Sequence, residues 1–280
     1  MLCRMSLAAI AFAALCVPCT VAQAHDETIY PDWNGQWRRP PGVGNQWDTS
    51  KPPRKGEAPL TAEYQAIYEA NLKDQAEGGQ GTDPTFTCIP DGMPRAMNVI
   101  FPMEIIILPK TTYMLIEYLS MLRRVFTDGR DWPVNIEPTF AGYSIGRWID
   151  EDGDGIYDVL EVETRGFKGP RAVDETGLPM HEDNQTIFKE RIYRDKADPK
   201  ILHDEMTMID NALTRPWTVD KKYVLNPDPR PNWPEYYTNE TNGQIKIGKE
   251  NYFLSWDGHL MPTKKGQAPP DLQYFKQGTK

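Results

Sequence analysis

The sequence predicts a mainly β protein: an antiparallel meander closed into a barrel or a strongly curled sheet, similar in architecture to a lipocalin. Between residues 101 and 225, runs rich in β-branched and aromatic residues alternate with turn-forming residues at intervals of about ten residues. Upstream of them, a single stretch has the apolar spacing of a helix. Closing a meander removes its exposed strand edges, which favours a barrel, and a β-sandwich is the alternative.

Residues 1–24 are predicted to form an export signal. Arg4 supplies a positive start, residues 7–17 form an apolar run, and Ala22-Gln23-Ala24 is a small-x-small cleavage site. One alternative is a transmembrane helix, for which the apolar run is too short. Another is a lipid anchor at Cys19, which lacks the small preceding residues that lipid attachment prefers. We therefore expect a periplasmic or secreted protein that begins at His25 and has no transmembrane segment.

Charge and cysteine content narrow the possible partners. The chain carries a net charge of −9, and its basic residues form no stripe interleaved with aromatic residues, so nucleic acid is not expected as a partner. Three of the four cysteines lie in the predicted signal, which leaves Cys88 alone. We expect no internal disulfide, and either a buried or an intermolecularly paired thiol at Cys88.

Residues 25–100 are predicted to be an irregular segment rich in Trp and Pro that wraps the β domain and contains one helix. The helix is expected at about residues 61–76, because Thr61 is a good N-cap residue, apolar residues follow at helical spacing, and Gly78-Gly79 ends the pattern. Three tryptophans, Trp33, Trp37 and Trp47, are spread among turn-forming residues before it.

Eight strands are predicted in the β domain, residues 101–225. They are expected at residues 103–109, 112–119, 122–128, 143–150, 159–166, 186–194, 201–210 and 217–225. The Pro-rich tail, residues 226–280, is expected to pack over the outside of this domain, with a short hairpin through residues 244–247 and 252–256.

The stretch DEDGDGIYDVLE, residues 150–161, has the spacing of a calcium-binding loop. Its expected ligands are Asp150, Asp152, Asp154, the Ile156 carbonyl, Asp158 and Glu161, with Gly155 at the position that bends sharply. Both flanks alternate as strands, so we expect a hairpin turn that binds a structural Ca²⁺ instead of a helix-loop-helix unit, with Glu161 the least certain ligand. The alternative is a solvated acidic turn without an ion.

Four stretches, RRVFTDGRDWP, PTFAGYSIGRW, LEVETRGF and ALTRPWTV, resemble a widespread family of exported bacterial proteins of unknown function, from Leu60 to Tyr223. The resemblance implies no activity. Many relatives have a short Glu-Gly-Asp turn in place of the acidic loop, which makes the loop an elaboration. The resemblance implies that a shared function lies in Arg123, Arg124, Asp128, Arg130, Tyr143, Ser144, Arg147, Trp148, Thr164, Gly166, Arg215 and Trp217.

Strand alternation places charges of both signs on one face of the predicted sheet. If some of these charges line a cavity, His203 with Glu205, and His181 with Asp183, are the best acid/base candidates, and Arg147 is a further candidate. The alternative is a solvated outer face with cross-strand Glu–Arg and Glu–Lys pairs, and structural histidines.

Other catalytic patterns find weaker support. Residues 142–146 fit G-x-S-x-G around Ser144, but this pattern lies within a predicted strand and lacks the strand-turn-helix setting of a nucleophile elbow. The four histidines have no zinc-like spacing, and copper at an N-terminal His25 is a remote alternative.

Three functions remain open. The preferred one is a barrel whose interior binds a small apolar or aromatic molecule. The second is an acid/base enzyme without an organic cofactor that acts on such a molecule. The third is a structural or envelope protein that binds another protein or a glycan.

Overall fold

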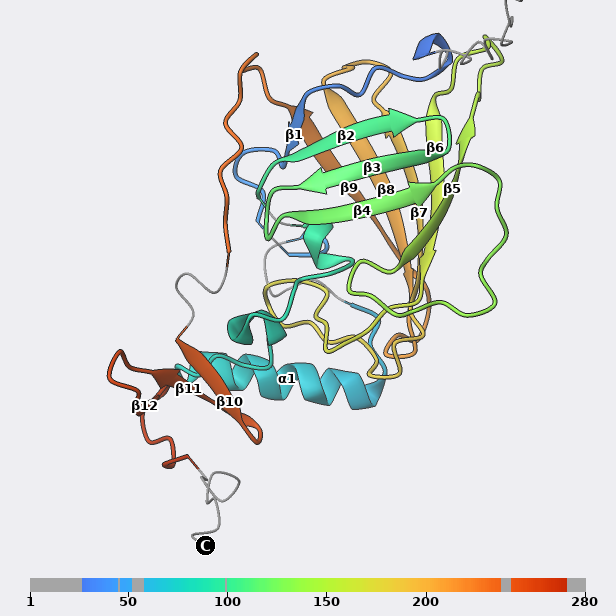
Figure 1. Ribbon diagram of the computed structural model, residues 1–280. Coiled ribbons are helices and arrows are strands. Elements are labelled where there is room, and N and C mark those ends of the chain that lie inside the picture. The colour runs from blue at the N-terminus through green and yellow to red at the C-terminus, as the bar shows by residue number, and fades with distance from the viewer. Residues whose placement is uncertain (1–26, 45, 52–57, 99, 238–242, 271–280) are drawn as a thin grey trace, which may run out of the picture.

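The computed structural model describes residues 27–44, 46–51, 58–98, 100–237 and 243–270. Nine strands form a closed barrel in chain order, and a separate three-stranded sheet follows (Figure 1). The predicted barrel is therefore confirmed. The predicted export signal and His25 lie outside the described residues. No helix in the described part of the chain is long and apolar enough to cross a membrane.

All eight strands predicted in the β domain are present. They are β2 (Met103–Leu108), β3 (Thr111–Ile116), β4 (Met121–Phe126), β5 (Tyr143–Ile149), β6 (Val159–Arg165), β7 (Ile187–Arg194), β8 (Ile201–Ile209) and β9 (Trp217–Leu225). The ninth, β1 (Gln36–Arg38), comes from the segment predicted to be irregular. It pairs with both β2 and β9, so this short strand closes the barrel.

The pairing of β4 with β5 differs from the expected antiparallel pattern, because these two strands run parallel. Residues 127–142 form the long connection that this direction requires. The parallel seam is short, with only Val125 and Phe126 of β4 paired. A Cβ atom at Gly146 would lie 2.6 Å from a methyl of Val125 and 2.9 Å from the Glu161 carbonyl oxygen. Glycine therefore permits the close approach of β4 and β5.

The predicted helix is confirmed as α1 (Ala62–Ala76), which lies across one end of the barrel (Figure 1). The Thr61 side chain caps it by accepting from the Tyr64 N–H. Asn71 is buried and donates to the Thr176 carbonyl oxygen over 2.8 Å, which ties α1 to the connection between β6 and β7. Three 3₁₀ helices, η1 (Glu27–Ile29), η2 (Pro84–Thr87) and η3 (Arg95–Met97), complete this part of the chain.

The C-terminal sheet consists of β10 (Gln244–Ile247), β11 (Glu250–Leu254) and β12 (Leu260–Pro262). The predicted hairpin is present and gains a third strand. This sheet lies beside α1, away from the barrel wall (Figure 1), and an ion pair between Lys264 and Asp74 joins the two. Earlier in the tail, Tyr236 stacks on Tyr118, with ring centroids 5.2 Å apart.

Three tryptophans of the N-terminal segment fill the barrel, each at most 1% exposed. Trp33 packs against Trp148 at the end that carries the acidic loop, with ring centroids 5.0 Å apart. Trp37 lies in β1, and Trp47 packs against Phe188 and Trp217 toward the end that carries α1. The segment therefore plugs the barrel from both ends.

The interior also contains charged side chains. Arg123 of β4 reaches across to β7, where its guanidinium forms a bidentate ion pair with Glu190. Asp204 and Lys221 are directly opposite one another on β8 and β9, and neither side chain is exposed. Burial raises the pKa of Asp204 and lowers that of Lys221. The Lys221 amine donates to the Trp47 carbonyl oxygen, so the polar interior also holds the tryptophan plug.

Candidate functional site

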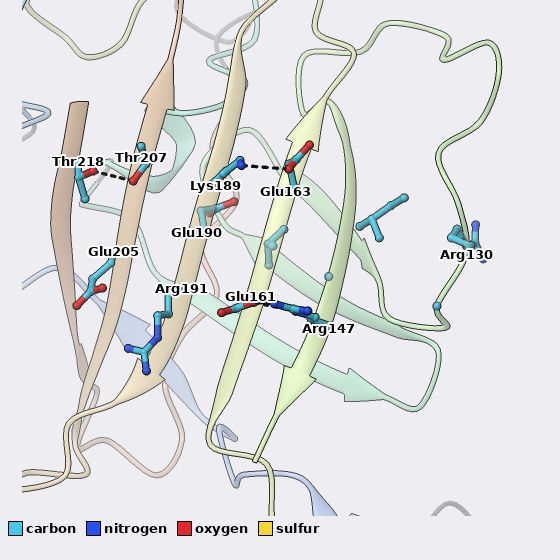
Figure 2. A pocket seen from close by; sticks show the side chains of 14 residues that line it. Arg130, Arg147, Glu161, Glu163, Lys189, Glu190, Arg191, Glu205, Thr207 and Thr218 are labelled. Carbon is cyan, nitrogen blue, oxygen red and sulfur yellow. Dashed lines mark hydrogen bonds and ion pairs between the residues drawn. The ribbon is translucent and has the colours of Figure 1, made fainter. Parts of the chain in front are cut away.

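A hollow of about 650 Å³ lies on the outside of the barrel as an open groove (Figure 2). Its floor is the outward face of β5 to β9, and we call it the outer groove. The lining residues are Gly129, Arg130, Ile145, Gly146, Arg147, Glu161, Val162, Glu163, Lys189, Glu190, Arg191, Glu205, Thr207 and Thr218.

The floor of the outer groove carries paired charges. Arg147 binds Glu161 across β5 and β6, with a nitrogen–oxygen distance of 2.6 Å. Lys189 lies 3.8 Å from Glu163, and Figure 2 shows this contact between β7 and β6. The outward face of these strands therefore carries the cross-strand Glu–Arg and Glu–Lys pairs that the sequence offered as the alternative to a charged cavity. Thr207 and Thr218 continue the pattern with hydroxyl oxygens 2.7 Å apart.

The connection between β4 and β5 forms one wall of the outer groove, and Arg130 anchors it. This side chain forms an ion pair with Asp128, donates to the Tyr143 hydroxyl over 3.1 Å and lies over the Phe126 ring. Hydrogen bonds from Arg130 lower the pKa of Asp128 to about 2. The contacts of Arg130 therefore hold the start of the β4–β5 connection in place as a wall of the outer groove.

All four motifs contribute to the outer groove. RRVFTDGRDWP supplies Gly129 and Arg130, PTFAGYSIGRW supplies residues 145–147, LEVETRGF supplies residues 161–163, and ALTRPWTV supplies Thr218. The parallel seam of β4 and β5 brings the first two motifs together. Other motif residues point inward: Arg123 donates to Thr164, whose hydroxyl bonds that of Ser144.

The acid/base candidates separate into two places. His203 is buried under the Tyr193 ring, and its Nδ1 and Nε2 atoms lie 3.0 Å from Asp220 and 3.2 Å from Asp195. Glu205 accepts from the Tyr193 hydroxyl over 2.7 Å and lines the outer groove together with Arg147. Because carboxylates hold both His203 nitrogens, neither nitrogen is placed to exchange a proton with a substrate.

His181 and Asp183 lie at the α1 end of the barrel. The His181 Nδ1 is 2.9 Å from the Asp183 carboxylate, and the His181 ring packs against Tyr64 of α1. Hydrogen bonds from Gln185, Asn211 and His181 outweigh the opposing effect of desolvation and lower the pKa of Asp183. These contacts give His181 a structural role in attaching α1.

Ser144 lies inside β5 and is 1% exposed, so the G-x-S-x-G pattern has a structural explanation. Gly142 adopts a left-handed conformation with φ of 74°, and a Cβ there would meet Phe167 and Thr164. Gly146 permits the approach of β4 described above. Cys88 is partly buried, and it is the sole cysteine among the described residues.

The acidic loop brings three predicted ligands together. Side-chain oxygens of Asp150, Asp152 and Asp158 lie within 4.8 Å of one another. Asp150 is held by the N–H groups of Gly153 and Gly155, at 2.7 and 2.9 Å. Asp154 accepts from the Ile156 N–H and lies outside this trio, while Glu161 points to the outer groove and pairs with Arg147.

Sequence reasoning did not select Lys189, Arg191, Glu163 or the wall at Gly129 as one site. Strand alternation did place these charges on the outward face, but the parallel seam that sets the wall beside them does not follow from strand periodicity. No family model and no curated protein matches this chain. The resemblance of the four motifs to exported bacterial proteins therefore stays a prediction.

Proposed function

We propose that this protein is an exported barrel that binds a small molecule in its outer groove. The supporting observation is the open hollow of about 650 Å³, to which all four motifs contribute residues. The interior, the site expected from the sequence, has weaker support because Trp33, Trp37 and Trp47 fill it together with the inward side chains of the strands.

The lining favours a small organic acid with an apolar or aromatic body. Four cations line the groove, and each pairs with one carboxylate: Arg130 with Asp128, Arg147 with Glu161, Lys189 with Glu163 and Arg191 with Glu151. A carboxylate ligand would exchange with the partly exposed Glu161 and Glu163 carboxylates, which costs little because surface ion pairs contribute about 0–1 kcal/mol. Ile145 and the threonine methyl groups offer apolar contact.

Titration with benzoate and octanoate, followed by amide NMR shifts, tests this proposal. We expect shifts at residues 145–147, 161–163 and 189–191, and about tenfold weaker binding after Arg147→Gln or Lys189→Gln, because each loses a charge-assisted hydrogen bond. Lys200→Gln, an exposed lysine on the β7–β8 turn, is the matched control. Shifts confined to Met206 and Val219 would assign the ligand to the interior, and equal binding by all variants would refute the proposal.

A second proposal is that the acidic loop binds one Ca²⁺. The Asp150, Asp152 and Asp158 oxygens lie within 4.8 Å of one another, no more than twice a Ca–O distance of about 2.4 Å, so one ion can contact all three. The loop is tied to the N-terminal segment, because the Tyr157 N–H donates to the Ile29 carbonyl oxygen and Tyr30 packs against Tyr157. Calcium would therefore strengthen the attachment of the tryptophan plug.

Thermal unfolding with and without millimolar CaCl₂ tests the calcium proposal. We expect stabilisation of about 2.7 kcal/mol when calcium is at 100 times its dissociation constant. Asp152→Asn and Asp158→Asn should abolish this gain, and Glu235→Gln, an exposed carboxylate outside the loop, should retain it. An unchanged melting temperature and no heat in calorimetric titration of the parent would exclude the site.

A further inference from the structure

The C-terminal sheet, residues 243–266, exposes a cluster of large apolar side chains. Trp256 is 98% exposed, and Met261, Phe253 and Leu254 are 52%, 42% and 41% exposed. Strand register sets Phe253 opposite Met261 at one end of the sheet, next to the turn that carries Trp256. The cluster therefore surrounds one tip of a small sheet that stands beside α1, away from the barrel (Figure 1).

This sheet is also basic within an acidic protein. Residues 243–266 contain four lysines and two carboxylates, whereas the whole chain carries a net charge of −9. Lys246, Lys249 and Lys265 are exposed, and Lys264 holds the sheet to α1 through its ion pair with Asp74. An anionic partner would therefore be attracted to this end of the molecule and repelled by the remainder.

We propose that the C-terminal sheet docks lengthwise on an anionic lipid surface, with Trp256 and its apolar neighbours in the interface at one end of β11 and the lysines near the phosphates at the other end. Tryptophan prefers the interface between water and lipid, and each lysine near an anionic leaflet contributes about 1 kcal/mol. Stable peripheral attachment to a membrane takes two such signals together, and this sheet combines both.

The arrangement of the apolar side chains favours lipid over a protein surface. Phe253 and Leu254 are successive strand residues and therefore point to opposite faces of the sheet, and both are exposed. Trp256 extends from the turn between these faces. A protein partner would cover one flat face, whereas a fluid lipid layer can surround a tip that is apolar on both sides.

Vesicle co-sedimentation of the chain from His25 onward tests this proposal. EDTA is included so that calcium cannot bridge the acidic loop to lipid. We expect binding to vesicles in which about a third of the lipid is phosphatidylglycerol, weakening as salt rises, and little binding to pure phosphatidylcholine. Lys246→Gln and Lys249→Gln should each weaken binding about fivefold, and Trp256→Ser should weaken it by a similar factor.

Matched controls are Trp233→Ser, an exposed tryptophan outside the sheet, and Lys200→Gln on the barrel, which should both bind as the parent does. All substituted side chains are exposed, so circular dichroism should report an intact fold for every variant. The proposal is overturned by equal binding to both vesicle types or by indifference to Trp256→Ser. It is also overturned if, without lipid, the parent forms a dimer that Trp256→Ser dissolves, because a second copy would then be the partner.

Discussion

At the scale of single residues, the barrel is unusual in placing Arg123 where a hydrophobic side chain would serve. Arg123 is 1% exposed and pairs with Glu190, whose side chain is fully buried. Burial alone would lower the pKa of Arg123, but the adjacent Glu190 carboxylate raises it. The guanidinium also donates to Thr164, so one side chain links β4 to β6 and β7 across the short parallel seam.

Arg123→Met should destabilise the protein by about 3–5 kcal/mol, because it leaves the Glu190 carboxylate buried without a partner. Arg124→Met is the matched control: Arg124 is the next residue, points outward and is exposed, so its loss should cost at most about 0.5 kcal/mol. Urea unfolding measures both. Combining Arg123→Met with Glu190→Met should recover much of the loss, and equal costs for the two single variants would contradict a structural role for the ion pair.

Asp91 should make stability depend on pH in the opposite sense to a carboxylate whose pKa is lowered, although it lies 3.5 Å from Arg95. Burial raises the pKa of Asp91 to about 6, although Arg95 opposes this effect. Between pH 3.8 and about 6 the folded state therefore holds one more proton than the unfolded state, so stability falls as pH rises through this window. The loss is at most about 3 kcal/mol.

Asp91→Asn should remove this dependence. Its free energy of unfolding, relative to that of the parent, should therefore increase between pH 4 and pH 6 in urea titrations. Asp128→Asn provides a comparison of opposite sign: the Asp128 pKa is lowered to about 2, so the parent keeps its advantage above the ordinary aspartate range and loses it in strong acid. A difference between Asp91→Asn and the parent that is independent of pH would refute the assignment.

At the scale of elements, sequence periodicity was sufficient for α1 and for eight strands of the barrel. Burial alternates along β3 and along Trp217–Leu225 as far as Tyr223, so local pattern and tertiary position agree there. The same alternation predicted the outward Glu–Arg and Glu–Lys pairs. Hydrophobic spacing reports which face of a strand is buried, and it is silent on which strand lies next to which.

Two features of the barrel could not be predicted for that reason. β1 has three residues, too few for a period to show, yet its pairing with β2 and β9 closes the sheet. The parallel pairing of β4 with β5 depends on contacts between residues far apart in sequence. The one local residue that permits it, Gly146, also fits a motif for a catalytic serine. The wall of the outer groove depends on this seam, so the groove could not be assembled from the sequence.

At the scale of the whole molecule, the N-terminal segment is part of the barrel's core. Trp47 is 1% exposed, its backbone N–H donates to the Asp174 carboxylate over 2.7 Å, and its carbonyl oxygen accepts from Lys221. One residue thereby joins the plug, the β6–β7 connection and the charged interior. The sequence led us to expect an interior that binds a ligand, but the N-terminal segment fills it. Shortening one side chain of this segment tests whether the interior can bind a small molecule.

Trp47→Ala should destabilise the protein by about 3–5 kcal/mol and leave a cavity lined by Phe188 and Trp217. Because an apolar cavity of this kind binds aromatic molecules, added indole should raise the melting temperature of Trp47→Ala by mass action. Trp256→Ala, which removes a 98% exposed ring, should lose little stability and gain nothing from indole, like the parent. If indole stabilised the parent as much as Trp47→Ala, the interior of the parent would already bind a ligand beside Trp47. The interior would then be favoured over the outer groove as the binding site. If indole stabilised neither the parent nor either variant, the strands would have moved inward to fill the space left by Trp47→Ala. The shape of the barrel would then depend on the Trp47 side chain.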